Sequence, residues 1–232
     1  MPLLALRFWV SSQAWLGSVS HGHPGEMNMF NLLKPSKMEA FSLPLCHPDT
    51  KEDVLQEIAD WVMDDKSHQN ILWLYGLAGS GKSTIAATIS NQLGALNRRG
   101  AFLFFKRERA DQDPKAVFHT IADQLAKTNP ILRAEISDAL RLHPNLVNDN
   151  IGDQFEKLIQ GPLEAASRAM CGPIAIIIDG LDEYGDNGPE SRFYPLSLRS
   201  LAYSLNVSDS SSQDAQNLIS MPRSRAITGS GC

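Results

Sequence analysis

The residues with the clearest chemical meaning form one glycine-rich stretch in the first half of the chain. Residues 76–84 match the phosphate-binding pattern G-x-x-x-x-G-K-S/T at every required position. Backbone N–H groups at a helix N-terminus, together with a lysine, can hold the negative charges of a triphosphate. The spacing therefore predicts a loop that binds a nucleoside triphosphate. Its members are Gly76, Leu77, Ala78, Gly79, Ser80, Gly81, Lys82, Ser83 and Thr84.

Each residue type in this stretch is expected to serve a different part of the ligand. Glycines lack a Cβ and allow the backbone conformations that turn successive N–H groups toward the phosphates. Lys82 is expected to reach the β- and γ-phosphates, and the Ser83 hydroxyl is expected to ligate Mg²⁺. Thr84 is expected to add a hydrogen bond near the α-phosphate. The alternative interpretation is a chance glycine-rich turn beside a solvated lysine.

The segments on both sides of the loop have the patterns that the motif requires. Residues 71–75 are an apolar run typical of a buried strand, and Ile85, Ile89 and Leu93 recur at the spacing of one helix face. A strand, a loop and a helix in this order are the context in which the motif binds phosphate.

The rest of the central sequence alternates strand and helix patterns. Residues 101–105 and 174–178 predict two further buried strands, and the second is rich in β-branched residues that suit a parallel sheet covered on both faces. Helical stripes lie at residues 54–62, 117–125, 131–140 and 151–163, and the prolines at 144 and 162 indicate breaks. This order predicts an α/β fold of the P-loop NTPase type, with a mostly parallel sheet between helices.

The chain is expected to contain three regions. Residues 1–40 lack sustained periodicity and are expected to form a poorly ordered leader. Residues 41–188 are expected to form the nucleotide-binding domain. Residues 189–232 are rich in Gly, Asn, Ser and Asp, and a poorly ordered or partly helical segment is expected there.

The second half of the expected site follows the strand at residues 174–178. Asp179 comes at the carboxyl end of this strand, where open α/β sheets bind ligands. It is therefore expected beside the glycine-rich loop, holding Mg²⁺ opposite Ser83. Asp182 and Glu183 are candidates to orient or deprotonate an attacking water, with Glu183 preferred as the base. The alternative for Asp179 is a strand-end turn former, and for Asp182 and Glu183 a solvated turn.

Composition limits the remaining functions. With 232 residues, 43% of them hydrophobic, the chain can bury one α/β core, and a net charge of -5 disfavours a general surface for nucleic acids. No apolar stretch is long enough to span a bilayer, so no membrane contact is expected. The three cysteines form no C-x-x-C pair, so no zinc site or disulfide framework is indicated and a cytoplasmic location is expected.

The glycine-rich motif and the acidic motif together resemble a known family. Residues 76–84, combined with Asp179-Gly180-Leu181-Asp182-Glu183 after a strand of isoleucines, are similar to the NACHT NTPases of the signal-transduction ATPases. The likeness is to the fungal NOD-like receptor type, related to the nephrocystin-like N-terminal domain, and covers about residues 28–188. Residues 46–50 resemble the family segment that passes near the base. The resemblance implies a switch that exchanges ADP for ATP, or uses GTP, and that self-associates or associates with related NACHT proteins.

The chain departs from this family pattern after the acidic residues. The resemblance implies a further strand ending in Thr-Ser-Arg, whose arginine senses the γ-phosphate, and no such strand is evident around Arg223 and Arg225. We therefore expect a truncated NACHT chain that binds Mg²⁺ and a nucleoside triphosphate with slow or absent hydrolysis. One alternative is an interaction or regulatory fragment of a NOD-like receptor that needs no nucleotide. Another is a P-loop kinase for a small acceptor, which the tandem carboxylates disfavour.

Overall fold

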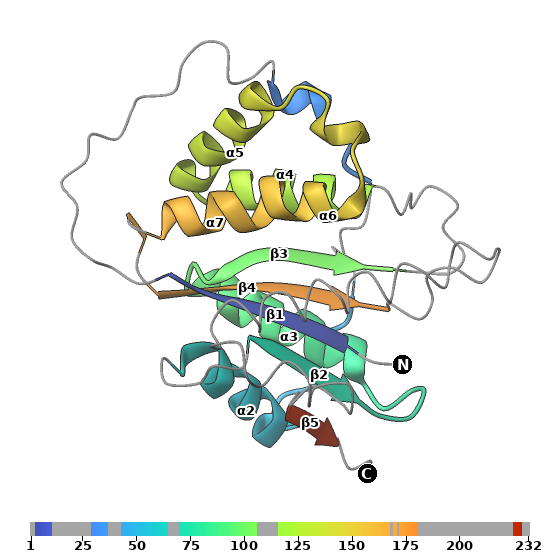
Figure 1. The fold of residues 1–232 in the computed structure, drawn as a ribbon. Helices are drawn as coiled ribbons and strands as arrows, with labels where there is room; N and C mark the ends of the chain where they lie inside the picture. Colours follow the sequence, from blue (N-terminus) through green and yellow to red (C-terminus); the bar gives the residue numbers. More distant parts are fainter. Residues whose placement is uncertain are drawn as a thin grey trace, which may run out of the picture.

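The computed structural model consists of a five-stranded sheet between two layers of helices (Figure 1). The structure describes residues 3–10, 29–36, 43–64, 70–105, 116–167, 169–170, 172–180 and 225–228. The strands are β1 (Leu3–Val10), β2 (Ile71–Tyr75), β3 (Arg99–Phe104), β4 (Gly172–Asp179) and β5 (Arg225–Thr228). The α-helices are α2 (Glu52–Met63), α3 (Lys82–Ala95), α4 (Val117–Thr128), α5 (Pro130–Leu142), α6 (Ile151–Phe155) and α7 (Gly161–Ala166). Short 3₁₀ turns are η1 (Phe30–Leu32) and η3 (Leu146–Asn148), and η4 (Glu156–Gln160) is a π-helix.

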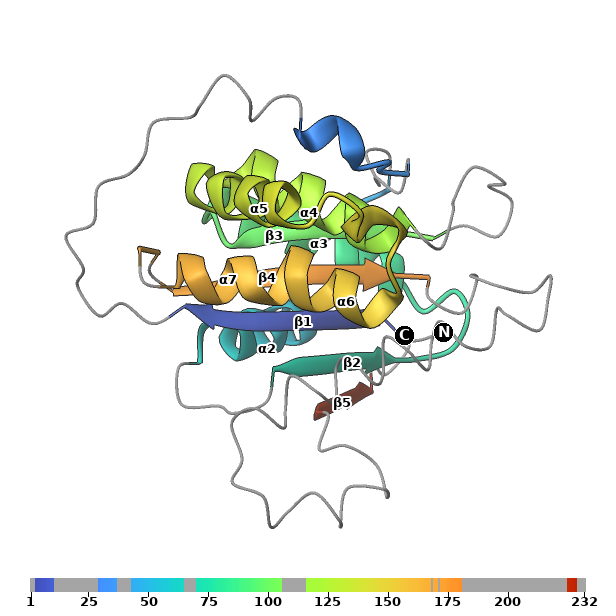
Figure 2. The ribbon, with the colours of Figure 1, turned by 45° about the horizontal axis from the view of Figure 1, so that its top comes forward.

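The sheet is buried on both faces, and its residues divide between two cores as the pleat of a strand requires. In β4, Ile176 and Ile178 face the core that contains α4, α5 and α7, whereas Ile177 faces the core that contains α2 and α3. Figure 2 shows α4, α5, α6 and α7 lying together over one face. Burial on both sides explains why β4 is apolar without alternation, and it agrees with the predicted α/β architecture.

The strand order is β3-β4-β1-β2-β5, and the sheet is mixed. β3 runs parallel to β4, and β2 runs parallel to β5. β1 lies in the middle and is antiparallel to both β2 and β4. The prediction of a mostly parallel sheet is therefore wrong at β1, because a strand from the start of the chain separates the two parallel pairs.

The structure also differs from the expected leader at residues 3–10. β1 pairs with β4 from Leu4 to Val10 and with β2 from Leu3 to Leu6. Arg7, which interrupts the apolar run in the sequence, is 1% exposed in this strand. The other residues of the expected leader that the structure describes, 29–36, include η1. Residues 1–2, 11–28 and 37–40 lie outside the described part of the chain.

The buried guanidinium of Arg7 is hydrogen-bonded to one end of α2. Its guanidinium donates hydrogen bonds to the backbone oxygens of Trp61 and of Asp64, the second at 2.7 Å, and lies 5.1 Å from the centre of the Trp61 ring. These carbonyls belong to the C-terminal end of α2, where the helix dipole favours a cation. Burial lowers the pKa of Arg7 below its ordinary value, and the Asp64 carboxylate opposes that effect. A charged residue can therefore occupy a central strand here.

The predicted helical stripes are buried as expected, with one difference at Pro162. The predicted stripe of α2, from Val54 to Val62, and that of α4, from Val117 to Leu125, both lie in the cores. Pro162 does not break its helix, because α6, η4 and α7 follow one another without a gap. The Gly161 N–H donates to the oxygen of Glu156, and this π-type bond changes the hydrogen-bond register just before the proline, which has no N–H.

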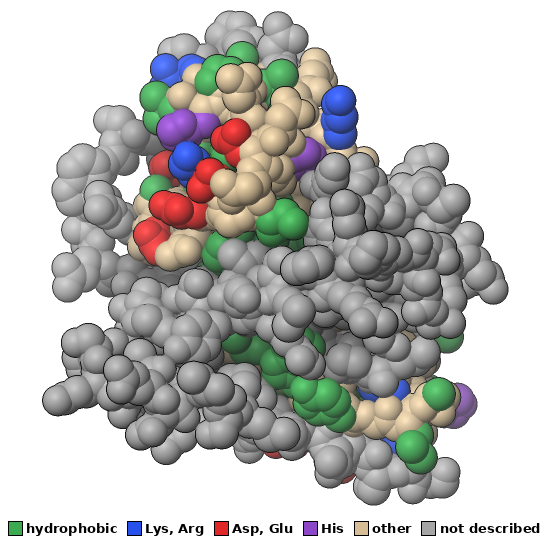
Figure 3. All heavy atoms as spheres, turned by 45° about the vertical axis from the view of Figure 1, so that its right-hand side comes forward, with side chains coloured by type: hydrophobic (Ala, Val, Ile, Leu, Met, Phe, Trp, Pro, Cys, Tyr) green, Lys and Arg blue, Asp and Glu red, His purple; other side chains and the backbone are tan. Residues whose placement is uncertain are grey.

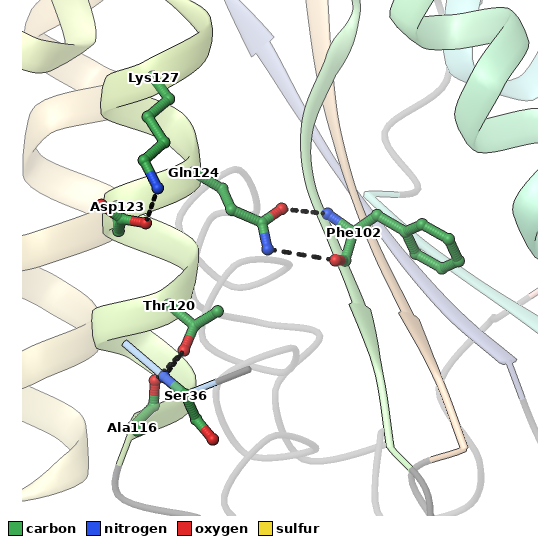
Figure 4. A network of polar contacts seen from close by, with 7 residues as sticks. All are labelled: Ser36, Phe102, Ala116, Thr120, Asp123, Gln124 and Lys127. Carbon is green, nitrogen blue, oxygen red and sulfur yellow. Dashed lines mark hydrogen bonds and ion pairs between the residues drawn. The ribbon is translucent and has the colours of Figure 1, made fainter. Parts of the chain in front are cut away.

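The free edge of the sheet at β3 is covered by a side chain from α4. The Gln124 amide oxygen accepts a hydrogen bond from the Phe102 N–H at 2.8 Å, and its Nε2 donates to the Phe102 oxygen at 3.2 Å (Figure 4). The side chain thus replaces a neighbouring strand at this position. Figure 4 also shows the Ser36 N–H, which donates to the Thr120 hydroxyl at 3.0 Å and ties residues 29–36 to α4.

Toward the end of the chain the structure describes residues 172–180 and 225–228. β5 shows that the predicted C-terminal segment, residues 189–232, contributes a strand to the sheet, and its other residues lie outside the described part. None of the helices in the described ranges is long and apolar enough to cross a membrane.

Candidate functional site

The glycine-rich loop connects β2 to α3 at the carboxyl edge of the sheet, and its glycines are required by its shape. Gly79 and Gly81 have φ angles of 77° and 86°, in the left-handed region that residues with side chains rarely adopt. At position 76 a side chain is disfavoured for a different reason, because a Cβ on Gly76 would lie 2.8 Å from the Ser80 hydroxyl oxygen. Gly81 is also the residue that precedes the first turn of α3. The sequence pattern and the local geometry therefore agree.

Lys82 turns its ammonium group back into the loop. It is 7% exposed, and its Nζ donates to the backbone oxygens of Gly76 at 2.9 Å and Leu77 at 2.7 Å. A third hydrogen bond reaches the Ser80 hydroxyl at 3.3 Å. The positive charge is thus held within the loop by the loop's own acceptors, and not extended into solvent. The solvated lysine of the alternative interpretation does not fit this arrangement.

The start of α3 adds backbone donors beside this charge. The N–H groups of Lys82, Ser83 and Thr84 belong to the first turn, where a helix offers no internal acceptor. The first turn contains no acidic residue that would offset the positive end of the helix dipole. Ser83 and Thr84 are half-buried, and Leu77, Ala78 and Gly79 are exposed. The loop therefore presents N–H donors, a hydroxyl and a cation, which is a donor set suited to a phosphate chain.

Residues 43–50 are attached to the same helix. The Cys46 N–H donates to the Thr88 hydroxyl at 2.8 Å, and that hydroxyl donates in turn to the Thr84 oxygen at 2.8 Å. The Thr50 N–H and hydroxyl both donate to the His47 oxygen and close a turn. The segment that resembles the family's base-proximal segment thus lies against the second turn of α3, close to the loop.

Asp179 ends β4 and is 4% exposed. Its backbone oxygen accepts a hydrogen bond from the Phe105 N–H at 2.9 Å, and it stands opposite Phe104 in the parallel ladder. Gly180 follows with a φ of 74°, and a Cβ there would lie 2.4 Å from the Phe105 oxygen. Both its positive φ and this clash explain why glycine occupies the position directly after Asp179.

The loop and Asp179 lie at the same edge of the sheet, after two strands that are not neighbours. Because β2 and β4 are both antiparallel to β1, they run in the same direction and end at the same edge. However, β1 separates them, with Leu3 opposite Leu74 on one side and Leu4 opposite Ile178 on the other. The strand that leads into the loop and the strand that ends at Asp179 are thus not paired with each other, and a shared Mg²⁺ site of Ser83 and Asp179 stays a prediction.

The remaining predicted residues are the two candidates for activating water and the two arginines near the end of the chain. Asp182 and Glu183, the candidates for activating water, lie outside the described residues. The structure contains a further strand that the sequence pattern did not reveal, β5, whose Thr228 pairs with Tyr75. Arg225 begins this strand, and its backbone stands opposite Leu72. Arg223 is not among the described residues.

A groove on the helical layer has a mainly acidic lining, in contrast to the glycine-rich loop with its lysine. Its volume is about 360 Å³, it lies between α5 and the η4–α7 segment, and four carboxylates line it together with Lys157 and His143. Figure 3 shows acidic side chains gathered on this layer. No residue of the glycine-rich loop lines the groove, and its carboxylates would repel a phosphate. The carboxylates belong to Glu135, Asp138, Glu156 and Glu164.

Comparison with known proteins assigns the central part of the chain. The sequence model of the nephrocystin 3 N-terminal family matches residues 49–220. The match includes both the glycine-rich loop and Asp179, whereas β1 and β5 lie outside it. Searches among curated proteins and among solved structures found no match.

Proposed function

Because the chain belongs to the nephrocystin 3 N-terminal family, and because its loop presents a cation and backbone donors together, we propose that it binds a nucleoside triphosphate with Mg²⁺. The observation that carries the proposal is the buried Lys82 ammonium, which lies 2.9 Å and 2.7 Å from two loop carbonyls at the start of α3. A structural lysine at this place would need no glycine at positions 79 and 81. An anionic ligand explains why a buried lysine and these two glycines occur together in the loop.

The residues present fit such a ligand. The positive φ angles of Gly79 and Gly81 and the space that a Cβ would take at Gly76 form a cradle for phosphate groups. Lys82 supplies the charge for the β- and γ-phosphates, and Ser83 is the metal ligand from the loop. Asp179 supplies a carboxylate at the same edge. When bound, Mg²⁺ would neutralise charge between the phosphates, which is its usual role in such sites.

We further infer that the chain has the P-loop NTPase fold of the NACHT type and acts as a switch with slow or absent hydrolysis. Rapid turnover needs positive charge near the developing γ-phosphoryl group, and the sequence pattern assigns no arginine to that position. Asp182 and Glu183 remain the candidates for positioning water. Use of ATP or GTP, self-association or association with related NACHT proteins, and a cytoplasmic location are proposals from the same resemblance.

Equilibrium binding tests the proposal directly. Fluorescent ATP, GTP, ADP and GDP are titrated into the full chain with and without Mg²⁺, and the same titrations are made with Lys82→Ala. Lys127→Ala is the matched control, since Lys127 is an exposed lysine paired with Asp123 at 2.7 Å. We expect binding by the native chain and the control and weakened binding by Lys82→Ala. Absence of nucleotide binding by the native chain would refute the proposal and leave an interaction module as the better function.

A further inference from the structure

A threonine on α3 joins residues 43–50 to the helix that follows the glycine-rich loop. The Thr88 hydroxyl accepts a hydrogen bond from the Cys46 N–H at 2.8 Å and donates to the Thr84 backbone oxygen, also at 2.8 Å. Thr84 is the last residue of the loop pattern and lies in the first turn of α3, and Thr88 follows one turn later. One hydroxyl group therefore links the segment to the turn that carries the loop's donors.

The Thr88 hydroxyl acts as donor and acceptor at once, and this double use limits what can replace it. A valine side chain has nearly the same shape but neither donates nor accepts, whereas a serine does both. Leu43 and Cys46 also pack, partly buried, against the core that contains α2 and α3. Because apolar packing is not directional, the directed hydrogen bond defines where along α3 the segment lies.

The backbone of this segment has a defined shape where it leads into α2. Asp49 and Lys51 have φ angles of 63° and 60°, in a region that residues with side chains rarely adopt. Between them, Thr50 closes a turn by donating its N–H and its hydroxyl to the His47 oxygen, at 3.1 Å and 2.6 Å. Such conformations persist where surrounding contacts hold them, and they are concentrated at ligand sites.

The order of the loop's donors indicates which part of a nucleotide would meet this segment. Lys82, at the start of α3, supplies charge for the β- and γ-phosphates, and Thr84 is expected at the α-phosphate. The nucleoside is bonded to the α-phosphate, so it leaves the loop on the Thr84 side, where residues 43–50 are attached. Leu45, 51% exposed, and the exposed His47 offer apolar and aromatic surface on which a base can pack.

We propose that Thr88 is a positioning residue, whose hydroxyl holds residues 43–50 where they contact the nucleoside of the ligand. The inference rests on the proposed function, because it needs a phosphate chain in the loop. Thr88 acts through the segment and not on the phosphates. Loss of its hydroxyl therefore weakens the contribution of the nucleoside to affinity and leaves the contribution of the phosphates unchanged.

A second threonine with the same pair of hydrogen bonds provides a matched control. The Thr120 hydroxyl donates to the Ala116 oxygen at 2.6 Å and accepts from the Ser36 N–H at 3.0 Å (Figure 4). It ties residues 29–36 to α4, which covers the opposite face of the sheet from α3 (Figure 1). Thr120→Val therefore removes the same two contacts on a different helix.

Affinities for ATP and for inorganic tripolyphosphate, both with Mg²⁺, separate the two parts of the ligand. The full-length native chain, Thr88→Val, Thr88→Ser and Thr120→Val are compared by calorimetry, after urea unfolding has established that each is folded. We expect Thr88→Val to weaken ATP binding about tenfold, as the loss of one hydrogen bond does, and to leave tripolyphosphate affinity unchanged. Thr88→Ser and Thr120→Val should bind both ligands as the native chain does.

Hydrogen exchange in the native chain tests the proposal without a substitution. ATP with Mg²⁺ should slow amide exchange in residues 43–50, and tripolyphosphate with Mg²⁺ should not. The positioning role is overturned if Thr88→Val weakens both ligands equally or neither, if Thr88→Ser does not restore ATP affinity, or if ATP leaves this exchange unchanged. Absence of ATP and tripolyphosphate binding by the native chain would instead refute the proposed function.

Discussion

Alanine substitutions at Gly79 and Gly180 should have clearly different effects on stability, although the two glycines share nearly the same backbone conformation. Their φ angles are 77° and 74°. A Cβ at Gly79 would meet no atom within 4 Å, whereas a Cβ at Gly180 would lie 2.4 Å from the Phe105 backbone oxygen. The pair therefore separates the cost of the left-handed conformation from the cost of a steric clash at the turn that follows Asp179.

The expected magnitudes follow from these two contacts. The left-handed conformation costs an alanine about 1–2 kcal/mol, and the smaller entropy of its unfolded chain offsets about 0.4–1 kcal/mol of that. Gly79→Ala should thus lower the free energy of unfolding by about 1 kcal/mol. Gly180→Ala adds about 1–3 kcal/mol of overpacking, for a total of about 2–4 kcal/mol. The clash is not easily relieved, because the Phe105 N–H is bonded to the Asp179 oxygen at 2.9 Å.

Urea unfolding of the native chain and both variants measures these free energies. The slopes of the three transitions should agree, so that the midpoints report stability. A Gly180→Ala variant no less stable than Gly79→Ala would show that Gly180 does not lie against the Phe105 oxygen. The reasoning that places the Asp179 carboxylate at the edge of the sheet would then be refuted.

Three further substitutions test the site and the sheet. Lys82→Ala should weaken triphosphate binding by about 1.5–3 kcal/mol, or roughly 10- to 150-fold, because a charge-assisted contact is lost, and calorimetry showing unchanged affinity would contradict the site. Asp179→Asn should mainly reduce the Mg²⁺ dependence of nucleotide affinity, and a metal titration with the same curve as the native chain would exclude Asp179 as a metal ligand. Gln124→Ala should lower the free energy of unfolding by about 1–3 kcal/mol, because the Phe102 N–H and oxygen at the β3 edge lose their hydrogen-bond partner. An unchanged urea midpoint would show that the Gln124 side chain is not needed to cover this edge.

The sequence alone predicted the local structure around the loop, because those features depend on neighbouring residues. The glycines at 76, 79 and 81 indicated a tight loop, and the structure gives a steric or conformational reason for each. The apolar periods of α2 and α4 predicted their buried faces, since the period of a helix determines which side chains share a face. The end of β4 at Asp179 followed in the same way from the run of β-branched residues.

Only the tertiary structure decided which strands are neighbours. Nothing in the order of residues 3–10 indicates that they pair with residues 71–74 and 172–178, because pairing between distant strands depends on which buried surfaces remain to be covered. Arg7 suggested a break in the sequence, yet the carbonyl oxygens at the end of α2 make it a buried strand residue. The composition of the loop determined its donors, but only the tertiary structure placed β1 between β2, which leads into the loop, and β4, which ends at Asp179. That strand order is a property of packing, which short-range sequence patterns do not encode.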